Sequence, residues 1–457
     1  MASAPDPIDD LLACPSCGLA LTRNRDAHRC EGCAVSYPAI DGIPWLVPDP
    51  GATFGEWRLR LARLITRLES DAAEIEAELS DTALAAKTRS RIKLMAGARR
   101  EHARRLASLL APLDPVRVQM PEPMHAAFGT PLPLSQDLTS YYVNVHRDWV
   151  WGDTENRLGL ELATRALGAH PAGRVLVLGA GAGRLAYDLH DAWSAQQTIV
   201  ADINPLLLLI AARMFRGEAL ELYEFPIAPR SSECCALLRR LTAPQAARAG
   251  LIPLLADASA PPFAAGAFDT VVTPWLIDIL EEDLAGFLPR LNRLLRPGGR
   301  WINTGSLVFA RPPAARQLGL EEVLDLIVAA GFERPSVDES EVPYMRSPAS
   351  RHGRIETVVT FGTERISPAV AGVAGCREPP WLRDERCPIR RDAATEMMAV
   401  SSRIHGFILS LIDGRRSLAD IVDLLVEQRL MTREDAEPAI RGFLLRLHEQ
   451  RSQPRWQ

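Results

Sequence analysis

Apolar residues follow two different periods along this chain, and each period predicts a kind of element. Between residues 55 and 111, apolar residues recur every three or four positions. One face of this stretch holds Leu61, Leu64 and Leu68, which predicts one long or two shorter amphipathic helices. From residue 141 to about 365, short apolar runs alternate with helical stretches. Strands alternating with helices are typical of a mostly parallel sheet with helices on both faces, so we expect an α/β fold of the doubly wound, Rossmann-like class.

The pattern also predicts where single elements lie. The runs 174–180, 197–203 and 267–277 are predicted strands of the α/β region. The run "RIETVVTFGTER" at 354–365 is predicted as a last strand, antiparallel at the end of the sheet. Beyond residue 393 the pattern predicts three short helices.

Composition adds the class of protein. The chain has 457 residues, of which 47% are hydrophobic and 24% charged, and its formal net charge is −5. These values are typical of a globular protein of several domains. The negative balance argues against a nucleic-acid footprint over the whole surface, so a nucleic-acid partner is not expected, and a local basic patch around Arg58–Arg105 is the alternative. No apolar run is long enough to span a membrane, and the first residues lack the basic start and apolar core of a secretory signal. We therefore expect a cytoplasmic protein with no membrane partner.

Four of the eight cysteines lie in two CxxC pairs, Cys14 with Cys17 and Cys30 with Cys33. Two such pairs can surround a zinc ion with four thiolates at about 2.3 Å. In a cytosolic chain this spacing indicates a metal site before a disulfide. We predict a closed structural zinc site on which the segment depends for folding, and a redox-active or disulfide pair is the alternative.

A glycine-rich turn follows the first predicted strand of the α/β region. In "RVLVLGAGAGRLA" (174–186), Gly179, Gly181 and Gly183 stand at alternate positions, where they let the backbone pass beneath a ligand. The next strand ends in Asp202, which is placed to accept hydrogen bonds from ribose hydroxyls. Both dinucleotide enzymes and S-adenosylmethionine-dependent methyltransferases have these features, so the turn alone does not decide the cofactor.

Two later motifs favour S-adenosylmethionine. Asp257 follows an apolar run and precedes the predicted strand that begins near Phe268. Its position is similar to that of the acid or amide that binds the adenine amino group in doubly wound methyltransferases. The stretch "LNRLLRPGGRWINTG" (291–305) predicts a helix that ends at Pro-Gly-Gly and is followed by a strand, an ending frequent in that class. A Rossmann-like domain that has lost its cofactor is the alternative.

Together these motifs resemble the carnosine N-methyltransferase family over about 141–363. The resemblance rests on the glycine turn and on "RDW" (147–149), "ENR" (155–157), "VVTPWLID" (271–278) and "LRPGGRWINTGSLVF" (295–309). It implies that Arg147 and Arg184 bind the methyl donor and that Asp278 binds an imidazole-containing substrate. Tyr344 matches one member of the family's tyrosine cluster and is a second candidate catalytic residue. The predicted donor-binding residues are Arg147, Gly179, Gly181, Gly183, Arg184, Asp202, Asp257, Ala258 and Pro274.

Asp278 also has a chemical argument of its own. It follows a strand at the carboxyl edge of the predicted sheet, where open α/β sheets bind ligands. Methyl transfer needs a neutral nucleophile, and an imidazole with a pKa near 6.5 is mostly neutral at pH 7. A carboxylate that accepts the far N–H would aim the near nitrogen and stabilise the imidazolium as it forms. A helix N-terminal cap is the alternative interpretation of Asp278.

Two departures from the family argue against carnosine itself as the substrate. Where the family carries a substrate-contacting histidine, this chain has Ala310, and the tyrosine cluster is reduced to Tyr344 with His352 and Arg354 nearby. We therefore predict an N-methyltransferase that acts on an imidazole- or amine-containing small molecule or dipeptide.

The two ends of the chain carry further resemblances. The stretch "YPAIDGIPWLV" (37–47) resembles the small zinc-binding domain that partners tRNA, rRNA and release-factor methyltransferases. The stretch "FILSLIDGRRSLADIVDLLVEQ" (407–428) resembles the winged-helix domain of pyrroloquinoline quinone biosynthesis, which holds a precursor peptide by strand addition. A methyltransferase that modifies a docked peptide or protein is therefore a second hypothesis. An ordinary helical or dimerising appendage is the bland interpretation of the C-terminal segment, and a scaffold without catalysis is a third hypothesis for the whole chain.

The predicted domain organisation is a zinc ribbon (1–50), a helical segment with a proline-rich linker (51–140), a methyltransferase domain (141–365), a linker (366–395) and a small helical, winged-helix-like domain (396–457).

Overall fold

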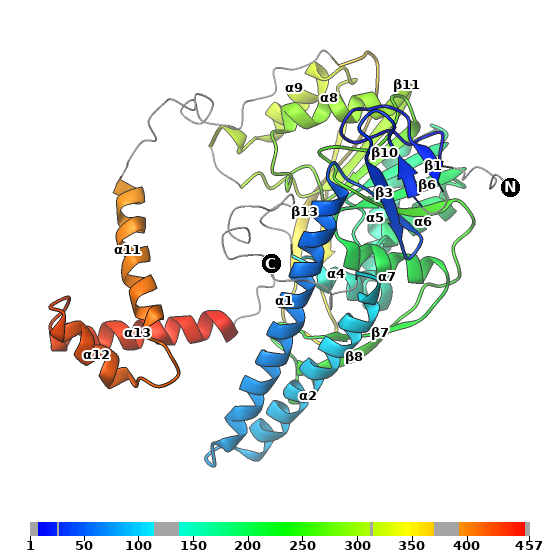
Figure 1. Ribbon diagram of the computed structural model, residues 1–457. Coiled ribbons are helices and arrows are strands. Elements are labelled where there is room, and N and C mark those ends of the chain that lie inside the picture. Colours follow the sequence, from blue (N-terminus) through cyan, green and yellow to red (C-terminus); the bar gives the residue numbers. More distant parts are fainter. Residues whose placement is uncertain (1–7, 25–26, 114–136, 311–313, 370–392, 453–457) are drawn as a thin grey trace. The chain divides into compact units, whose positions relative to one another are not determined.

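A computed structural model of the chain describes residues 8–24, 27–113, 137–310, 314–369 and 393–452. The chain forms two compact units, Met1–Gly375 and Cys376–Gln457, and each is described by itself (Figure 1). Most of the expected proline-rich linker and most of the expected linker at 366–395 lie outside the described residues.

A mostly parallel sheet organises the first unit. Seven of its strands follow the order β9-β6-β5-β10-β11-β13-β12, and among these seven β13 runs antiparallel to both of its neighbours. Because β9, β6, β5 and β10 are adjacent and parallel, their carboxyl ends meet at one edge of the sheet. The α/β, Rossmann-like prediction is confirmed. The seven strands are β5 (Arg174–Leu178), β6 (Gln197–Asp202), β9 (Leu251–Ala256), β10 (Phe268–Pro274), β11 (Leu295–Gly305), β12 (Val337–Tyr344) and β13 (Arg354–Glu364).

Four short N-terminal strands lengthen this sheet beyond β9. They pair antiparallel with one another in chain order, and the last of them, β4, pairs with β9 in parallel, with Trp45 opposite Leu255. The cysteine-bearing segment and the α/β region therefore share one hydrogen-bonded sheet. The strands are β1 (Thr22–Asn24), β2 (Ala27–Arg29), β3 (Ser36–Ile40) and β4 (Ile43–Leu46).

Two long helices follow, α1 (Pro50–Ala77) and α2 (Ala86–Leu109), and they lie side by side (Figure 1). Helix α1 begins where Asp49 caps the N–H of Ala52 at 2.9 Å and Pro50 occupies the first turn, as the start of a helix favours. Leu61, Leu64 and Leu68 are buried. Of the two predicted forms of this segment, one long helix or two shorter ones, the two-helix form is confirmed.

Several of the remaining helices of the first unit pack on the sheet. Helix α5 packs on β11, β12 and β13, α7 packs on β6 and β9, and α8 packs on β10 and β11. A separate antiparallel hairpin, β7 (Leu220–Glu224) with β8 (Leu237–Leu241), lies between α7 and β9 in the chain. The helices are α4 (Tyr142–His146), the π-helical turn η4 (Arg147–Trp151), α5 (Asp153–Leu167), α6 (Arg184–Ala192), α7 (Pro205–Phe215), α8 (Leu284–Leu294) and α9 (Leu320–Ala329), with 3₁₀ turns η1 (Glu78–Ser80), η2 (Ala111–Leu113), η5 (Ser232–Cys235) and η6 (Ala314–Arg316).

Two sequence expectations about the sheet are corrected. Strand β13 is antiparallel as predicted, but it lies between β11 and β12, because β12 pairs along its outer side. Strand β11 begins at Leu295, before the Pro-Gly-Gly sequence that was expected to end a helix. Its ladder with β10 shifts register there, and Gly299 fits between two backbone carbonyls, since a Cβ would lie 2.9 Å from one of them.

The second unit contains the three predicted helices, α11 (Ala393–Ser410), α12 (Leu418–Glu427) and α13 (Arg433–Ser452). Ser417 and Asp420 cap the start of α12 reciprocally. Residues 393–452 include no strand, so the winged-helix resemblance stays a prediction. Among the described residues, none of the helices has the length and apolar character needed to cross a membrane. The core of this unit consists of Ile421, Val422, Leu425, Ala436 and Ile440.

Candidate functional site

The glycine turn joins β5 to α6 at the carboxyl edge of the sheet. Gly179, Gly181 and Gly183 have φ of 69°, 58° and 81°, in the left-handed region that favours glycine. A Cβ would lie 2.8 Å from Leu276 at Gly179 and 2.7 Å from Phe215 at Gly183, but at Gly181 it would meet nothing within 4 Å. The outer glycines are therefore required for close packing, whereas Gly181 borders open space in which a ligand can lie.

Asp202, at the end of β6, is hydrogen-bonded to this turn. Its Oδ2 accepts from the backbone N–H of Gly181 at 2.7 Å, and its Oδ1 accepts from that of Asn204 at 2.8 Å. Burial raises the pKa of Asp202 to about 6, although the neighbouring backbone N–H groups lower it. The carboxyl group predicted to bind ribose hydroxyls is thus held against the glycine turn.

Three further predicted donor residues lie at the same edge. Asp257 begins the turn after β9, and its Oδ1 accepts from Ser259 N at 2.7 Å. Ala258 packs against the hydrophobic core, and Pro274 is the buried last residue of β10. Because β9, β6, β5 and β10 are neighbours, these residues flank the glycine turn on both sides.

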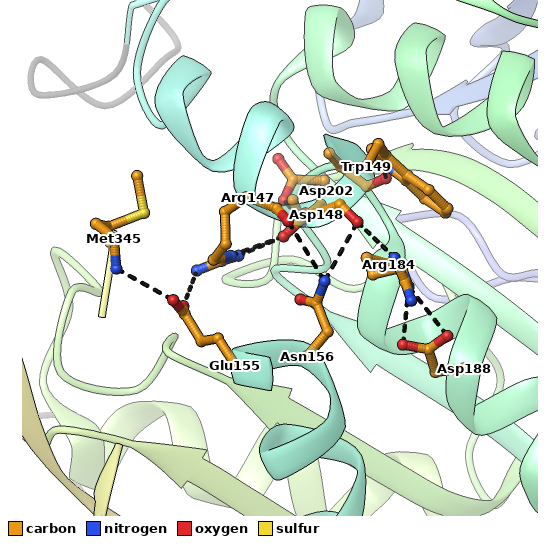
Figure 2. Close-up of polar contacts among 11 residues, drawn as sticks. Arg147, Asp148, Trp149, Glu155, Asn156, Arg184, Asp188, Asp202 and Met345 are labelled. Carbon is orange, nitrogen blue, oxygen red and sulfur yellow. Dashed lines mark hydrogen bonds and ion pairs between the residues drawn. The ribbon is translucent and has the colours of Figure 1, made fainter. Parts of the chain in front are cut away.

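Arg147 lies in the π-helical turn η4, and carboxylates surround its guanidinium (Figure 2). Its Nε and Nη2 contact Oδ1 of Asp148 at 2.8 and 2.7 Å, and its Nη1 donates to Oε1 of Glu155 at 3.1 Å. Burial lowers the pKa of Arg147, but the two carboxylates outweigh it and leave the pKa above its ordinary value. The other oxygen of Glu155 accepts from Met345 N at 3.1 Å.

Arg184 connects this π-helical turn to the glycine turn. Its Nη1 donates to the carbonyl of Asp148 at 2.7 Å, its Nε pairs with Asp188 at 2.9 Å, and its guanidinium lies 5.5 Å from the ring of Trp149. Trp149 in turn donates through Nε1 to the carbonyl of Ala182, within the glycine turn, at 3.0 Å. Arg184 therefore braces two donor-side segments, and direct contact of Arg147 or Arg184 with a donor stays a prediction.

Three buried carboxylates share these two guanidiniums. Asp148 and Glu155 pair with Arg147, and Asp188 pairs with Arg184. Burial raises the pKa of all three carboxyl groups. When these three carboxylates and two guanidiniums are all ionised, they carry one excess negative charge, which favours a positively charged ligand beside them.

Asp278 lies in the turn that follows β10, at the same edge. It is 9% exposed, and its Oδ2 accepts from Val308 N at 2.8 Å, which ties it to the segment after β11. The next helix, α8, begins only at Leu284 with Asp283 as its N-cap residue. The helix-cap interpretation of Asp278 is therefore wrong, and its carboxylate instead joins two loops at the edge of the sheet.

Tyr344, the last residue of β12, packs against the aromatic ring that follows β10. Its ring centroid lies 4.8 Å from that of Trp275, and the guanidinium of Arg354 lies 4.6 Å from it. Burial raises the pKa of Tyr344. Trp275 stands three residues before Asp278 and has φ of 51°. Tyr344 and Trp275 thus form an aromatic wall at the carboxyl ends of β12 and β10.

Residues 345–353, here called the strap, connect β12 to β13 and are fastened to the loop after β7. Arg230 N donates to the carbonyl of Ala349 at 2.9 Å, and Arg351 N donates to the carbonyl of Ala228 at 2.9 Å. The side chain of Arg351 adds hydrogen bonds to the carbonyls of Pro229 and Arg230 at 2.8 Å. The strap therefore begins beside Tyr344 and ends beside Arg354.

The four predicted metal ligands come together from two segments, one before β1 and one between β2 and β3. The sulfur atoms of Cys14, Cys17, Cys30 and Cys33 all lie within 4.8 Å of one another. Tyr37 places its hydroxyl 3.1 Å from the sulfur of Cys14. Burial raises the pKa of the Cys14 thiol, but hydrogen bonds from Tyr37 and the backbone outweigh it and bring the pKa down to about 6. This cluster can hold a metal ion, since metals bind the thiolate form.

Residues 176–303 match a family model described as a methyltransferase domain. The match begins in β5, includes the glycine turn, Asp202 and Asp257, and ends in β11. The chain carries a methyltransferase domain. The mostly parallel sheet, with β13 antiparallel, gives this domain a Rossmann-like methyltransferase fold. No curated protein matches the chain.

Among solved structures, the chain is similar to several methyltransferases. Phosphoethanolamine N-methyltransferase 2 of Haemonchus contortus, in complex with S-adenosyl-L-methionine, is 18% identical with a TM-score of 0.29, and the match covers 40% of this chain and 38% of that one. A possible histamine N-methyltransferase of Thermotoga maritima is 16% identical with a TM-score of 0.31, over 50% of this chain and 98% of that one. The complex of the Haloferax volcanii Trm112 methyltransferase activator with a methyltransferase is 13% identical with a TM-score of 0.34, and the match covers 50% of this chain and 96% of that one. The chain thus spans less than half the length of the Haemonchus protein.

The structure gives roles to residues to which the sequence assigned none, three of them inside the motifs 147–149, 155–157 and 271–278. Asp148, Glu155 and Asp188 are the carboxylates of the buried network, and Trp275 is the partner of Tyr344. The four-residue spacing from Arg184 to Asp188 is a signal for a helical ion pair. No periodicity joins Glu155 to Met345, which lie 190 positions apart.

Proposed function

We propose that the protein transfers a methyl group from S-adenosylmethionine to a nitrogen atom of an imidazole- or amine-containing small molecule or dipeptide. The observation that carries this proposal is the division of one sheet edge between two kinds of residue. Gly181, whose N–H donates to Asp202, borders open space on the β5 and β6 side, while buried Asp278 follows β10 three residues after Trp275, which packs against Tyr344.

The donor side suits a cationic nucleoside. S-adenosylmethionine carries a positive sulfonium group, and the network around Arg147 has one excess negative charge when ionised. The ionised carboxylate of Asp202 would accept hydrogen bonds from the ribose hydroxyls, and that of Asp257 would accept one from the adenine amino group. Gly181 would let the backbone approach the donor closely.

The acceptor side suits a neutral nitrogen nucleophile. The acceptor nitrogen attacks the methyl carbon with its lone pair, the carbon–sulfur bond breaks, and its electron pair goes to sulfur. Positive charge therefore moves from sulfur to the acceptor. Asp278 would accept a hydrogen bond from an N–H group of the methyl acceptor. This hydrogen bond would align the nitrogen lone pair with the carbon–sulfur bond and stabilise the cation that develops. The hydrogen bond from Val308 holds this carboxylate in place.

The test separates the donor site from the acceptor site. In purified full-length protein, Asp278→Ala should bind S-adenosylmethionine in calorimetry as the wild type does. It should lose about 100-fold or more in kcat/KM with labelled donor and either histamine or carnosine as acceptor. Asp325→Ala, which removes an exposed carboxylate paired with Arg334, is the matched control and should leave both values unchanged. Normal turnover by Asp278→Ala would remove the assigned role of Asp278.

We propose zinc as the occupant of the cysteine cluster. Tetrahedral zinc with sulfur at about 2.3 Å separates its ligand atoms by about 3.8 Å. The cluster fits this spacing, with 3.9 Å from Cys14 to Cys33 and 3.5 Å from Cys17 to Cys30. Elemental analysis should find one zinc ion per chain. Cys30→Ser should lose it, while Cys235→Ser, at a cysteine outside the cluster, should retain it.

A peptide acceptor is the second candidate function. It is favoured by an exposed apolar row on α11, where Met397, Val400 and Ile404 are 73%, 56% and 50% exposed, at the spacing of a helix face. Replacing Val400 and Ile404 together by Glu should then weaken methylation of peptides by the full chain while leaving methylation of histamine unchanged. Equal activity of this variant towards a peptide mixture would favour the small-molecule function.

A further inference from the structure

Glu155 joins the two halves of the site. Its Oε1 accepts from Nη1 of Arg147 at 3.1 Å, and its Oε2 accepts from the backbone N–H of Met345 at 3.1 Å (Figure 2). Arg147 belongs to the π-helical turn that Arg184 and Trp149 fasten to the glycine turn, whereas Met345 is the first residue of the strap. One buried side chain, 11% exposed, thus connects a donor-side element to an acceptor-side element.

We propose that Glu155 is a positioning residue, which sets Tyr344 and the strap in place relative to the methyl donor. The proposal rests on the proposed function for the assignment of the acceptor side. It assigns to Glu155 no contact with the reacting atoms. Its effect on the reaction passes through Met345 and Tyr344.

The backbone of Met345 explains why this anchor is needed. Met345 has φ of 53°, in the left-handed region that is strained for a residue with a side chain. Such a conformation persists where its surroundings hold it. The carboxylate of Glu155 binds the N–H of this residue. Without that hydrogen bond we expect the turn to relax, and Tyr344, directly before it, to move away from Trp275.

The far part of the strap has other anchors, so the effect should be local. Arg230 and Arg351 hold the strap to the loop after β7 through main-chain and side-chain hydrogen bonds. These contacts do not involve Glu155. Its loss should therefore loosen the start of the strap and leave the fold of the unit intact.

A role as an ordinary helix acid does not explain this geometry. Glu155 lies in the first turn of α5, where acidic residues favour the helix dipole, but Asp153 already supplies an exposed acid there. Burying a carboxylate is unfavourable unless partners satisfy it. Both oxygens of Glu155 find those partners in other elements, η4 and the strap.

The experiment compares Glu155→Ala and Glu155→Gln with Glu161→Gln in the full-length protein. Glu161 lies on the same helix, is 52% exposed and pairs with Arg157 at 3.9 Å, so its variant is the matched control. Hydrogen exchange of the peptide 344–353 is measured by mass spectrometry with saturating S-adenosylmethionine, and donor affinity is measured by calorimetry. These readouts do not depend on the identity of the acceptor.

For Glu155→Ala we expect exchange in 344–353 to rise about tenfold, the effect of losing one hydrogen bond to a charged group. The Kd of S-adenosylmethionine should change by less than about threefold. Glu155→Gln should raise exchange less, because its amide oxygen can still accept from Met345 N. With histamine or carnosine as acceptor, Glu155→Ala should raise KM more than it lowers kcat.

Unchanged exchange in 344–353 for a folded Glu155→Ala protein would overturn the proposal, as would a loss of donor binding without a change in exchange. If Glu155→Ala does not fold, Glu155→Gln carries the same comparison. Failure to methylate either acceptor would count against the proposed function, while the exchange measurement would still decide the role of Glu155.

Discussion

The charge of Asp202 changes near neutral pH, and this follows from its surroundings. Burial raises its pKa to about 6, above the ordinary value of 3.8. The folded protein therefore holds this proton more tightly than the unfolded chain. Protonated Asp202 therefore stabilises the fold; this contribution to the free energy of unfolding is complete below about pH 4 and is lost as the pH rises through about 6. The ionised carboxylate of Asp202 is the better hydrogen-bond acceptor for hydroxyl groups, so ionisation favours binding of a nucleoside.

We predict that the affinity for S-adenosylmethionine increases about tenfold from pH 5 to pH 7, as Asp202 goes from mostly protonated to mostly ionised. Calorimetry across this range measures the effect. Asp202→Asn keeps an oxygen that can accept from Gly181 N but has no charge to gain, so it should bind more weakly at pH 7 and show a flat profile. A wild-type profile that Asp202→Asn reproduces would assign the pH dependence to the carboxylates around Arg147 instead.

The glycine turn allows a matched pair of substitutions. Gly183→Ala places a Cβ 2.7 Å from Phe215, whereas at Gly181 the added Cβ meets nothing within 4 Å. We expect Gly183→Ala to lower the free energy of unfolding by about 1–3 kcal/mol, measured by urea denaturation. Gly181→Ala should lower it less but weaken binding of the donor, because its methyl group enters the open space. Equal effects of Gly183→Ala and Gly181→Ala on the free energy of unfolding and on donor affinity would contradict the assignment of Gly183 to packing and of Gly181 to ligand binding.

At the scale of elements, the segment before β1 links the cysteine cluster to the carboxyl edge of the sheet. Leu12 forms a β-bridge with Phe263, and Ala13 N donates to the carbonyl of Pro262 at 2.9 Å. Cys14 follows Ala13 directly, and residues 262–264 follow the turn that begins at Asp257. The turn that begins at Asp257 is therefore supported by the same backbone that presents Cys14, the first cysteine of the cluster.

We predict that removal of the metal weakens donor binding as well as stability. A chelator that strips the bound metal should lower the thermal midpoint and raise the Kd of S-adenosylmethionine severalfold, because the segment after Asp257 loses its support. Calorimetry before and after chelation measures the change, and added zinc should reverse it. Unchanged affinity after complete metal loss would show that the β4–β9 ladder holds this segment without the metal.

At the scale of the whole molecule, the repeating patterns of the sequence predicted most of the architecture. The strand runs became β5, β6 and β10, the two-helix segment became α1 and α2, and the C-terminal pattern became three helices. Periodicity reports which residues face a core, and these elements each bury one face or both. It does not report which strand lies beside which. The inner position of β13 and the pairing of β4 with β9 therefore required the tertiary structure.

The sequence by itself determined the local chemistry of the candidate site. The glycine turn, Asp202, Asp257 and the cysteine pairs each follow from short spacings, because a tight turn or a metal knuckle needs particular residues at fixed distances along the chain. The tertiary structure decided how distant groups meet. In the folded chain, Arg147 and Arg184 form ion pairs with carboxylates, and Glu155 accepts a hydrogen bond from Met345. Asp278 does not cap a helix there, because α8 begins only at Leu284. Such contacts join segments up to 190 positions apart, and only the folded sheet determines which of them share an edge.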